Sequence, residues 1–270
     1  FTLSSHKSNA QSFSSVKFNS DSLLFDGNSI NKYYTSGCSG KVSNIKGCAK
    51  IIKPSGECGV PGTESNASIG DNAAQGDVIK VCPKSMIEIT LSDGSIMRGA
   101  PNSEINMSEL NCEGGRSFSL RLLLGTAWSE VAPVMGGDTK YEVSTENAVV
   151  GSRGTKFNVR FVIDTTKYDD ETKIERKTII TVLEGKVEVY NTNKATLTPL
   201  AEQKKITDDY ENRRITLEEF TRKINEVQNN YKVIVEAGME TMVYNENPPM
   251  QPVRTSYSLN DFSGEGILGR

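Results

Sequence analysis

Short apolar runs separated by glycine turns dominate the chain from Gly76 onward. Runs such as DVIKV, MIEITL, FSLRLLLGTAW and KFNVRFVI are rich in β-branched residues and often alternate apolar with polar positions. Such alternation is typical of half-buried strands, and the Asp-Gly and Glu-Gly pairs in SDGS and LEGK supply the positive φ of tight hairpins. The pattern predicts a mainly β fold, in which hairpins stack on one core as a short irregular β-solenoid or β-sandwich.

One segment has the period of a helix instead. In RITLEEFTRKINEVQNNY the apolar positions recur at spacings of three and four and form a single stripe: Leu217, Phe220, Ile224, Val227 and Tyr231. Thr216 and Glu219 fit a capping box at its start. We therefore expect one inserted amphipathic helix, within about residues 207–230, that docks on the sheet. A helix that binds a partner is the alternative.

The two ends of the chain differ from this β region. Residues 1–75 are rich in Ser, Asn and Gly and bury too little apolar surface to fold alone, so we expect an extension ordered by disulfides, by the main domain or by a neighbouring subunit. After the proline-rich NENPPMQP, one side of an alternating strand carries Val253, Thr255, Tyr257 and Leu259. We therefore divide the chain into residues 1–75, a β domain over 76–252, and an extended tail over 253–270.

Composition and charge narrow the classes of function. The 270 residues carry 31 Lys and Arg against 34 Asp and Glu, a net charge of −3, whereas a nucleic-acid footprint normally needs a basic face. No apolar run reaches the roughly 18 residues that a membrane span requires. The chain begins at Phe1 rather than Met. We therefore expect an extracellular or cell-surface protein whose signal peptide has been removed, with no nucleic-acid partner.

The cysteines indicate disulfides rather than a metal site. None of the five is spaced as CxxC, the usual arrangement of zinc ligands: Cys38, Cys48, Cys58, Cys82 and Cys112. Three of them sit in glycine-containing loops, which favours disulfide bonds in an oxidising compartment. The odd number leaves one cysteine free or bonded to another chain. As one pair we expect Cys82 with Cys112, which flank the first hairpin region.

No catalytic or cofactor motif stands out. The single histidine, His6, lies in the Ser-rich leader, and the acidic run Asp169–Glu171 lacks the glycine and the spaced oxygen ligands of a calcium loop. The glycosylation patterns at Asn66 and Asn106 are interpreted as chance matches. Trp128 lies on a β run. We expect no metal, no cofactor and no enzymatic activity.

The stretch AVVGSRGTKFNVRF places an arginine between two glycines within strand-like sequence. The glycines permit backbone angles that other residues avoid at a sharp corner, and the arginine is expected to turn back and bond carbonyls or a carboxylate with its planar fork. The expected structural residues of this corner are Gly151, Arg153, Gly154 and Thr155. An anion or glycan contact by Arg153 is the alternative.

These motifs together resemble the FecR-type domain family. AQGDVIKV and IEITLSDGSIMRGAPNSEINM resemble the family's opening strand, its DGS hairpin and its PNS corner. YEVSTENAVVGSRGTKFNV resembles its RGT motif, with Asn147 where proline is usual and Ser152 where valine is usual. TVLEGKVEVYN and VIVEAGMETMVYNENPPMQP resemble the closing strands. The resemblance covers roughly residues 75–252 and implies an extracytoplasmic β domain without catalysis.

Three functions remain open at this point. We expect a secreted structural subunit of a filament or surface assembly, because the tail strand at Val253, Thr255, Tyr257 and Leu259 is suited to adding to the open sheet edge of another copy. The first alternative is a FecR-like extracytoplasmic sensor that responds to a transport event. The second is a module that binds glycans of the cell envelope.

Overall fold

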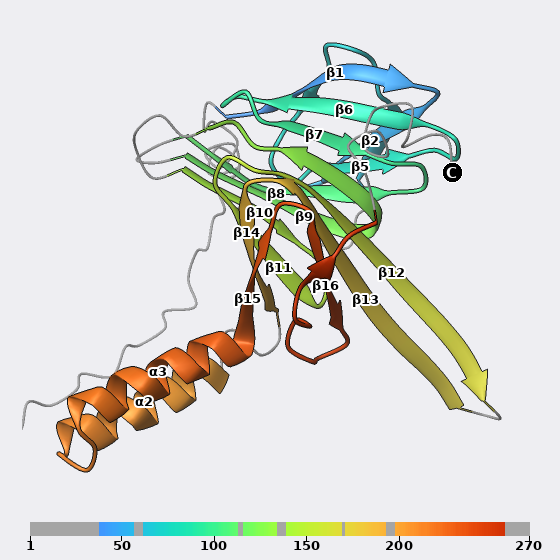
Figure 1. Cartoon of the computed structure of the whole chain (residues 1–270). Coiled ribbons are helices and arrows are strands. Elements are labelled where there is room, and N and C mark those ends of the chain that lie inside the picture. The colour runs from blue at the N-terminus through green and yellow to red at the C-terminus, as the bar shows by residue number, and fades with distance from the viewer. Residues whose placement is uncertain are drawn as a thin grey trace, which may run out of the picture.

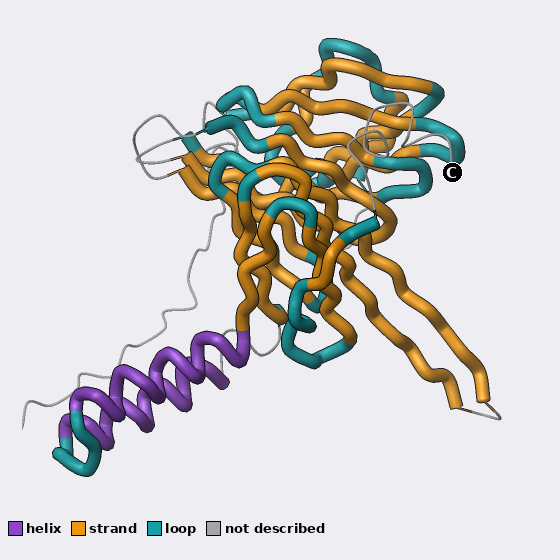
Figure 2. Tube along the Cα trace, viewed as in Figure 1, coloured by secondary structure: helices purple, strands orange, loops and turns teal. Residues whose placement is uncertain are grey.

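The structure is a computed structural model that describes residues 38–56, 62–112, 116–133, 139–168, 171–192 and 198–256. The prediction of a mainly β fold is confirmed, as the strands form the body of the molecule in Figures 1 and 2. Two helices project from one end of this body, and a long two-stranded ribbon projects from the same end. Residues 57–61 and both chain ends, among others, lie outside the described part.

Within the described residues the strands divide into two runs along the chain. The first run contains β1 (Gly40–Lys46), β2 (Ala49–Lys53), β3 (Thr63–Asn66), β4 (Asn72–Ala73), β5 (Val78–Val81), β6 (Met86–Leu91), β7 (Ile96–Gly99) and β8 (Glu104–Asn111). The second contains β9 (Arg116–Glu130), β10 (Thr139–Ser144), β11 (Ala148–Ser152), β12 (Lys156–Tyr168), β13 (Glu171–Glu184), β14 (Lys186–Asn191), β15 (Lys232–Glu236), β16 (Met239–Tyr244) and β17 (Val253–Arg254).

The strands pair in two sheets that share β9. The first sheet contains β4, β1, β6, β7, β9, β12, β13, β16 and β17. The second contains β3, β2, β5, β8, β9, β10, β11, β14 and β15. Only the β9–β10 pairing is parallel among these. Because β1 to β4 pair within the two sheets, the main domain orders this part of the N-terminal segment.

One strand passes from sheet to sheet at a glycine. The first half of β9 pairs with β8 and β10, and the second half pairs with β7 and β12. The bend lies at Gly125, whose φ of 90° is one that L-residues rarely adopt. Ser103, from the PNS corner, holds this bend: its Oγ accepts from Thr126 N at 2.8 Å and donates to Thr126 O at 2.9 Å.

We expect Gly125→Ala to lower the free energy of unfolding by about 2–4 kcal/mol. An added Cβ would lie 2.5 Å from Ser103 Oγ and 2.7 Å from Ser103 Cα, so backbone must move in addition to the φ strain. Gly94→Ala is the matched control, because Gly94 has a similar φ of 86° but open space around the new Cβ. Urea unfolding of both variants checks this, and equal losses would contradict the crowding argument.

The core lies between the inward faces of the two sheets. The predicted alternation after the RGT corner is confirmed, because Phe157, Val159 and Phe161 are all at most 1% exposed. Tyr141 packs edge-on against Phe157 and donates to Ser129 Oγ at 3.0 Å. Burial raises the pKa of Tyr141 far above its ordinary value, so its hydroxyl stays a donor.

The β12–β13 ribbon extends beyond the sheets. Strand β12 pairs with β9 only as far as Phe161, whereas its pairing with β13 continues to Tyr168 (Figure 1). On the face that continues the core side, Ile163 and Ile174 are 40% and 46% exposed. The second sheet covers Phe161, but nothing in the described part packs over the distal ribbon. Ile163 and Ile174 are therefore exposed.

The predicted helix is confirmed as α3 (Leu217–Tyr231), and the structure adds a second helix, α2 (Thr198–Glu211). The capping box forms as expected: Glu219 N donates to Thr216 Oγ1 at 3.2 Å, and Thr216 N donates to Glu219 Oε2 at 3.1 Å. The docking on the sheet is wrong, because α3 packs on α2 and the hairpin stands away from the sheets (Figure 1). Tyr210 and Phe220 stack between the helices, with ring centroids 4.8 Å apart.

The disulfide pairs differ from the expected Cys82–Cys112 bond. Cys38 is bonded to Cys112, and Cys48 is bonded to Cys82. The register explains the difference, because β2 pairs with β5 and brings the β1–β2 turn beside the end of β5. Cys82 N also donates to Cys48 O at 3.1 Å. The remaining cysteine, Cys58, lies outside the described residues.

The C-terminal strand is paired within its own chain. Strand β17 adds to β16, with Met239 opposite Arg254 and Glu240 opposite Val253. Thr255 N donates to Gly238 O at 3.0 Å, and Thr255 Oγ1 donates to Glu240 Oε2 at 3.2 Å. The expectation that this strand has no place in its own molecule is therefore wrong for Val253 and Thr255. Tyr257 and Leu259 lie outside the described residues.

Candidate functional site

The RGT corner is held by its threonine rather than by its arginine. Thr155 is buried, its Oγ1 donates to Lys186 O at 3.0 Å, and its carbonyl accepts from Val131 N at 2.9 Å. Gly154 has the positive φ expected of a corner, at 69°. Gly151 has no positive φ, and a Cβ there would meet no atom within 4 Å. Thr155 and Gly154 are thus the structural part of the motif.

Arg153 has no structural partner among the described residues. Its side chain is exposed at the tip of the corner, and within the described residues it makes no hydrogen bond and no ion pair. The expected fork onto carbonyls or a carboxylate is therefore wrong, because the tip points the side chain into solvent. An exposed arginine on a rigid corner is available to an external group, such as an acidic side chain of a partner.

A groove of about 390 Å³ lies beside this corner. It runs from the β6–β7 hairpin at Gly94 to Pro133, and it includes Glu130, Lys156 and Glu184. Lys156 Nζ lies 3.1 Å from Glu184 and 3.4 Å from Glu130. The hydrogen bond to Glu184, followed by the charge of Glu130, raises the pKa of Lys156. The groove therefore presents fixed charges of both signs next to the free Arg153.

The outward face of the first sheet carries the chain's one tryptophan, but its ring is covered by another side chain. Trp128 is only 6% exposed because the Arg98 guanidinium lies 4.1 Å from its ring centroid. Arg98 Nε in turn lies 2.6 Å from Glu88 Oε2. Since the chain has one tryptophan and this one is covered, it offers no exposed indole on which a sugar ring stacks.

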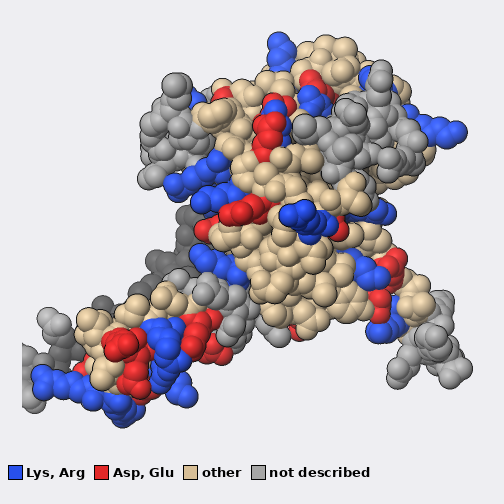
Figure 3. All heavy atoms as spheres, in the orientation of Figure 1, with Lys and Arg blue, Asp and Glu red and all other residues tan. Residues whose placement is uncertain are grey.

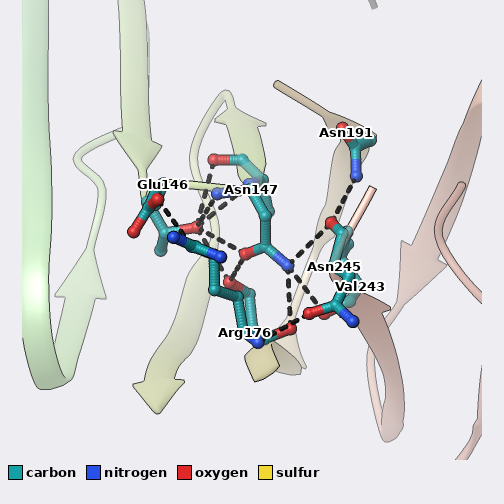
Figure 4. Close-up of polar contacts among 9 residues, drawn as sticks. Glu146, Asn147, Arg176, Asn191, Val243 and Asn245 are labelled. Atoms are coloured by element: carbon teal, nitrogen blue, oxygen red, sulfur yellow. Dashed lines mark hydrogen bonds and ion pairs between the residues drawn. The ribbon is translucent and has the colours of Figure 1, made fainter. Parts of the chain in front are cut away.

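A cluster of buried asparagines joins the roots of the projecting elements (Figure 4). Asn147, 1% exposed, donates from Nδ2 to the carbonyls of Arg176, Val243 and Asn245 at 3.1–3.2 Å. Its Oδ1 accepts from Thr178 Oγ1 at 2.5 Å. Asn147 therefore ties the β10–β11 turn to β13 and to the end of β16.

Four further contacts complete the cluster. Asn191, also 1% exposed, donates to the carbonyls of Asn245 and Asn247 at 3.0 and 2.9 Å, just before the chain leaves for α2. Arg176 N donates to Asn245 Oδ1 at 2.7 Å. Arg176 Nε lies 2.5 Å from Glu146 Oε1, an ion pair that is off the hydrogen-bond direction. Sequence reasoning missed this cluster, because only the fold brings its members together.

The ribbon carries a charged face opposite Ile163 and Ile174. Lys173 lies 2.8 Å from Glu175, and Lys177 lies 3.0 Å from Asp164. The hydrogen bond from Lys173, followed by one from Tyr244, lowers the pKa of Glu175 to about 2. Figure 3 shows both signs of charge along this ribbon and along the helices, with no single-sign patch on the face in view.

A second groove, of about 610 Å³, lies at the C-terminal edge of the domain. Its apolar lining includes Ile234, Met239 and Pro252, and Glu236 and Arg254 supply one charge of each sign. Val253, which we expected to contact another chain, lies at this edge and is 58% exposed. Strands β15 and β17 are each the last strand of their sheet here.

The other candidate residues from the sequence form no binding or metal site within the described residues. The Asn106 side chain donates to Gly76 O at 3.1 Å and is half-buried, whereas Asn66 is exposed on β3. Asp169 and Asp170 lie outside the described part. Among the residues that are described, no group of three His, Cys, Asp or Glu side chains is placed to hold a metal ion. No helix in that part is both long and apolar enough to cross a membrane.

Comparison with known proteins gives one family. Residues 77–188 match the family model described as FecR protein. A comparison with curated proteins found no match. Two crystal structures described as a candidate anti-sigma factor from Parabacteroides distasonis ATCC 8503 align with a TM-score of 0.41, at 16% and 15% identity. The alignments cover 69% and 70% of this chain but only 62% and 63% of those chains.

Proposed function

Since residues 77–188 form a FecR domain, we propose that the protein is an extracytoplasmic signalling domain that reports the state of a partner protein. The family match is the observation that carries this proposal. The resemblance is to a family of regulators rather than of enzymes, which supports a non-enzymatic role.

The filament subunit that the tails suggested is wrong. The FecR match contradicts it, because the family's proteins act in signalling and not as fibre subunits. The physical premise fails as well, since β17 is already paired with β16 and is not a spare strand. The sensor hypothesis, which we held as an alternative, fits the family.

Two disulfides support an extracytoplasmic location for this role. Cys38–Cys112 and Cys48–Cys82 both form within the described residues. Disulfides persist in oxidising compartments and are rare in the cytosol, where thiols are kept reduced. These bonds support an extracytoplasmic location as part of the proposal.

The partner surface in this proposal is the RGT corner with its adjoining groove. Arg153 is exposed and unpaired among the described residues, while Thr155 fixes the backbone beneath it. Because the backbone of the corner is already ordered, only the rotamer freedom of the Arg153 side chain is lost when it binds a carboxylate of a partner. Glu130, Lys156 and Glu184 beside it provide further charge complementarity.

A transcript comparison in the native organism tests the function. We expect deletion of the gene to change the transcription of a defined set of genes, and the wild-type gene to restore it. A strain carrying Arg153→Ala is expected to behave like the deletion, although the purified variant keeps its melting temperature. Arg160→Ala is the matched control, because Arg160 is likewise an exposed arginine but lies on β12, outside the RGT corner.

The outcomes separate the domain's role from its contact surface. An unchanged transcript profile after deletion rules out a signalling role. If deletion changes the profile but Arg153→Ala does not, signalling stands and the RGT corner is not the contact. A glycan-binding module is expected to show binding to cell-wall material without any transcript response.

A further inference from the structure

Strand β15 leaves one edge of the second sheet open. It pairs with β14 on one side, and no strand of the described part pairs with its other side. In the same register Ala237 N donates to Gly185 O at 3.0 Å. Since backbone groups alternate in direction along an antiparallel pair, those of Ile234 and Glu236 point away from β14, to the open edge. There they have no hydrogen-bond partner among the described residues.

The other outer strands in the described part are protected against pairing. Strand β17 has two residues, β3 is polar and exposed throughout, and β1 carries a bulge between Val42 and Asn44. Short strands, polar side chains and bulges are the usual means by which proteins avoid pairing at a sheet edge. Strand β15 has five residues without a proline or a bulge, and Ile234 at its centre is 42% exposed. It is therefore the edge most suited to accepting a further strand.

The groove of about 610 Å³ borders this edge, because Ile234 and Glu236 line it. Met239 and Pro252 add apolar surface to the same groove. An added strand would bond to the backbone of the edge and cover this apolar surface with its side chains. The open backbone groups therefore favour an extended segment as the occupant.

The order of side chains in β15 selects a second copy of the chain as this segment. The strand reads Lys-Val-Ile-Val-Glu, with a base at its start and an acid at its end. An antiparallel copy centred on Ile234 sets Lys232 of each strand opposite Glu236 of the other. Opposite residues of an antiparallel pair have Cβ atoms about 4.5–5.5 Å apart, so both ends of the contact gain a pair of opposite charges.

The backbone agrees with the same centre. Because the groups of Ile234 point to the open edge, the Ile234 residues of the two copies can exchange both of their N–H to C=O bonds. A shift by one residue would set the core-facing Val233 and Val235 opposite outward side chains, and a shift by two would lose both charge pairs. One register therefore satisfies backbone, core and charge together.

We propose that β15 is a dimerisation edge, to which β15 of a second copy adds in antiparallel orientation, so that the second sheets of the two copies become continuous. Each copy uses the same edge, so the contact is a closed two-fold dimer and does not extend into a filament. It lies away from the RGT corner and does not depend on the signalling role.

Sedimentation equilibrium of the full chain, with a charge swap, tests the proposal. The 29.5 kDa chain is expected to show a mass that rises toward twice this value across the micromolar concentration range. Lys232→Glu and Glu236→Lys are each expected to raise the dimer dissociation constant about tenfold, because like charges then lie opposite at both ends. The double variant restores opposite charges and is expected to return the constant to within about threefold of the parent value. Lys232 Nζ also lies 3.7 Å from Glu188 Oε1 of its own chain, so thermal unfolding of each variant separates lost stability from lost contact.

A proline variant tests the backbone contact. Ile234→Pro removes an N–H that points to the open edge and no bond to β14, so it is expected to abolish the dimer and keep the fold. Glu64→Pro is the matched control and is expected to leave the dissociation constant unchanged. Ala67 N donates to Ala49 O at 2.8 Å in the register of β2 and β3, so the N–H of Glu64 also points away from its neighbouring strand.

Three results would overturn the proposal. The first is a protein that is monomeric at every concentration, in which case the edge is left to a strand of another protein or to solvent. The second is a dimer that tolerates Ile234→Pro. The third is a charge swap whose double variant is no tighter than the single ones, because the antiparallel register centred on Ile234 requires the recovery.

Discussion

Replacing Asn147 with alanine is expected to lower the free energy of unfolding by about 3–5 kcal/mol. The side chain is 1% exposed and donates to three carbonyls, and its own carbonyl accepts from Thr178. Alanine removes these bonds and the volume of the amide, while Arg176 O keeps its bond from Asn245 N and Asn245 O keeps its bond from Asn191 Nδ2. The loss is large because one side chain serves the β10–β11 turn, β13 and the end of β16 together.

Equilibrium unfolding in urea measures this effect, with Asn66→Ala as the control. Asn66 is exposed on an edge strand, so its replacement is expected to change stability by less than about 0.5 kcal/mol. Asn147→Asp keeps the shape but sets a second acceptor against three carbonyls, and it should destabilise at least as much as alanine. A loss below about 1 kcal/mol for Asn147→Ala would show that water replaces the amide.

Removing either disulfide is expected to cost about 4 kcal/mol. The bonds close loops with sequence separations of 74 residues for Cys38–Cys112 and 34 for Cys48–Cys82. In the chain-entropy account the cost depends only weakly on loop length, so the two losses should differ by less than about 1 kcal/mol. Both bonds attach β1 and β2 to the rest of the domain. In the variants that lack a bond, these strands should therefore show the earliest hydrogen exchange.

Paired serine variants measure each loss by equilibrium unfolding. They are best made in a Cys58→Ser background, so that the fifth cysteine does not exchange with the bonded ones. Dithiothreitol should lower the free energy of unfolding of the parent protein. It should leave the free energy of unfolding unchanged in a variant that lacks both disulfides. Peptide mapping under non-reducing conditions checks the pairing itself, and a Cys82–Cys112 peptide would contradict the structure.

The helical region shows which features a local sequence pattern predicts and which it does not. The stripe from Leu217 to Val227 and the capping box at Thr216 predicted α3 and its start, because both signals are local and the structure bears them out. Helix α2 was missed because its apolar positions are sparse and its interior is rich in charged residues. That α3 packs on α2 and not on the sheet was decided by the presence of this second helix.

The RGT corner shows the same limit at single residues. The positive φ at Gly154 and the burial of Phe157, Val159 and Phe161 follow from glycine chemistry and from strand alternation. Which side chain holds the corner did not follow, since Thr155 reaches Lys186 O only because β14 returns beside β11. Arg153 has no partner among the described residues, which its position between two glycines did not predict.

By itself the sequence determined the mainly β class, the resemblance of its β region to the FecR family, the start of the long helix and the alternation of core residues. These depend on backbone preference and on a period of two or of 3.6 residues, which neighbouring positions express directly. The tertiary structure alone decided the Cys38–Cys112 and Cys48–Cys82 pairs, the asparagine cluster around Asn147 and the place of β17. Each of these joins residues far apart in the chain, and the pairing of strands across two sheets sets which of them meet.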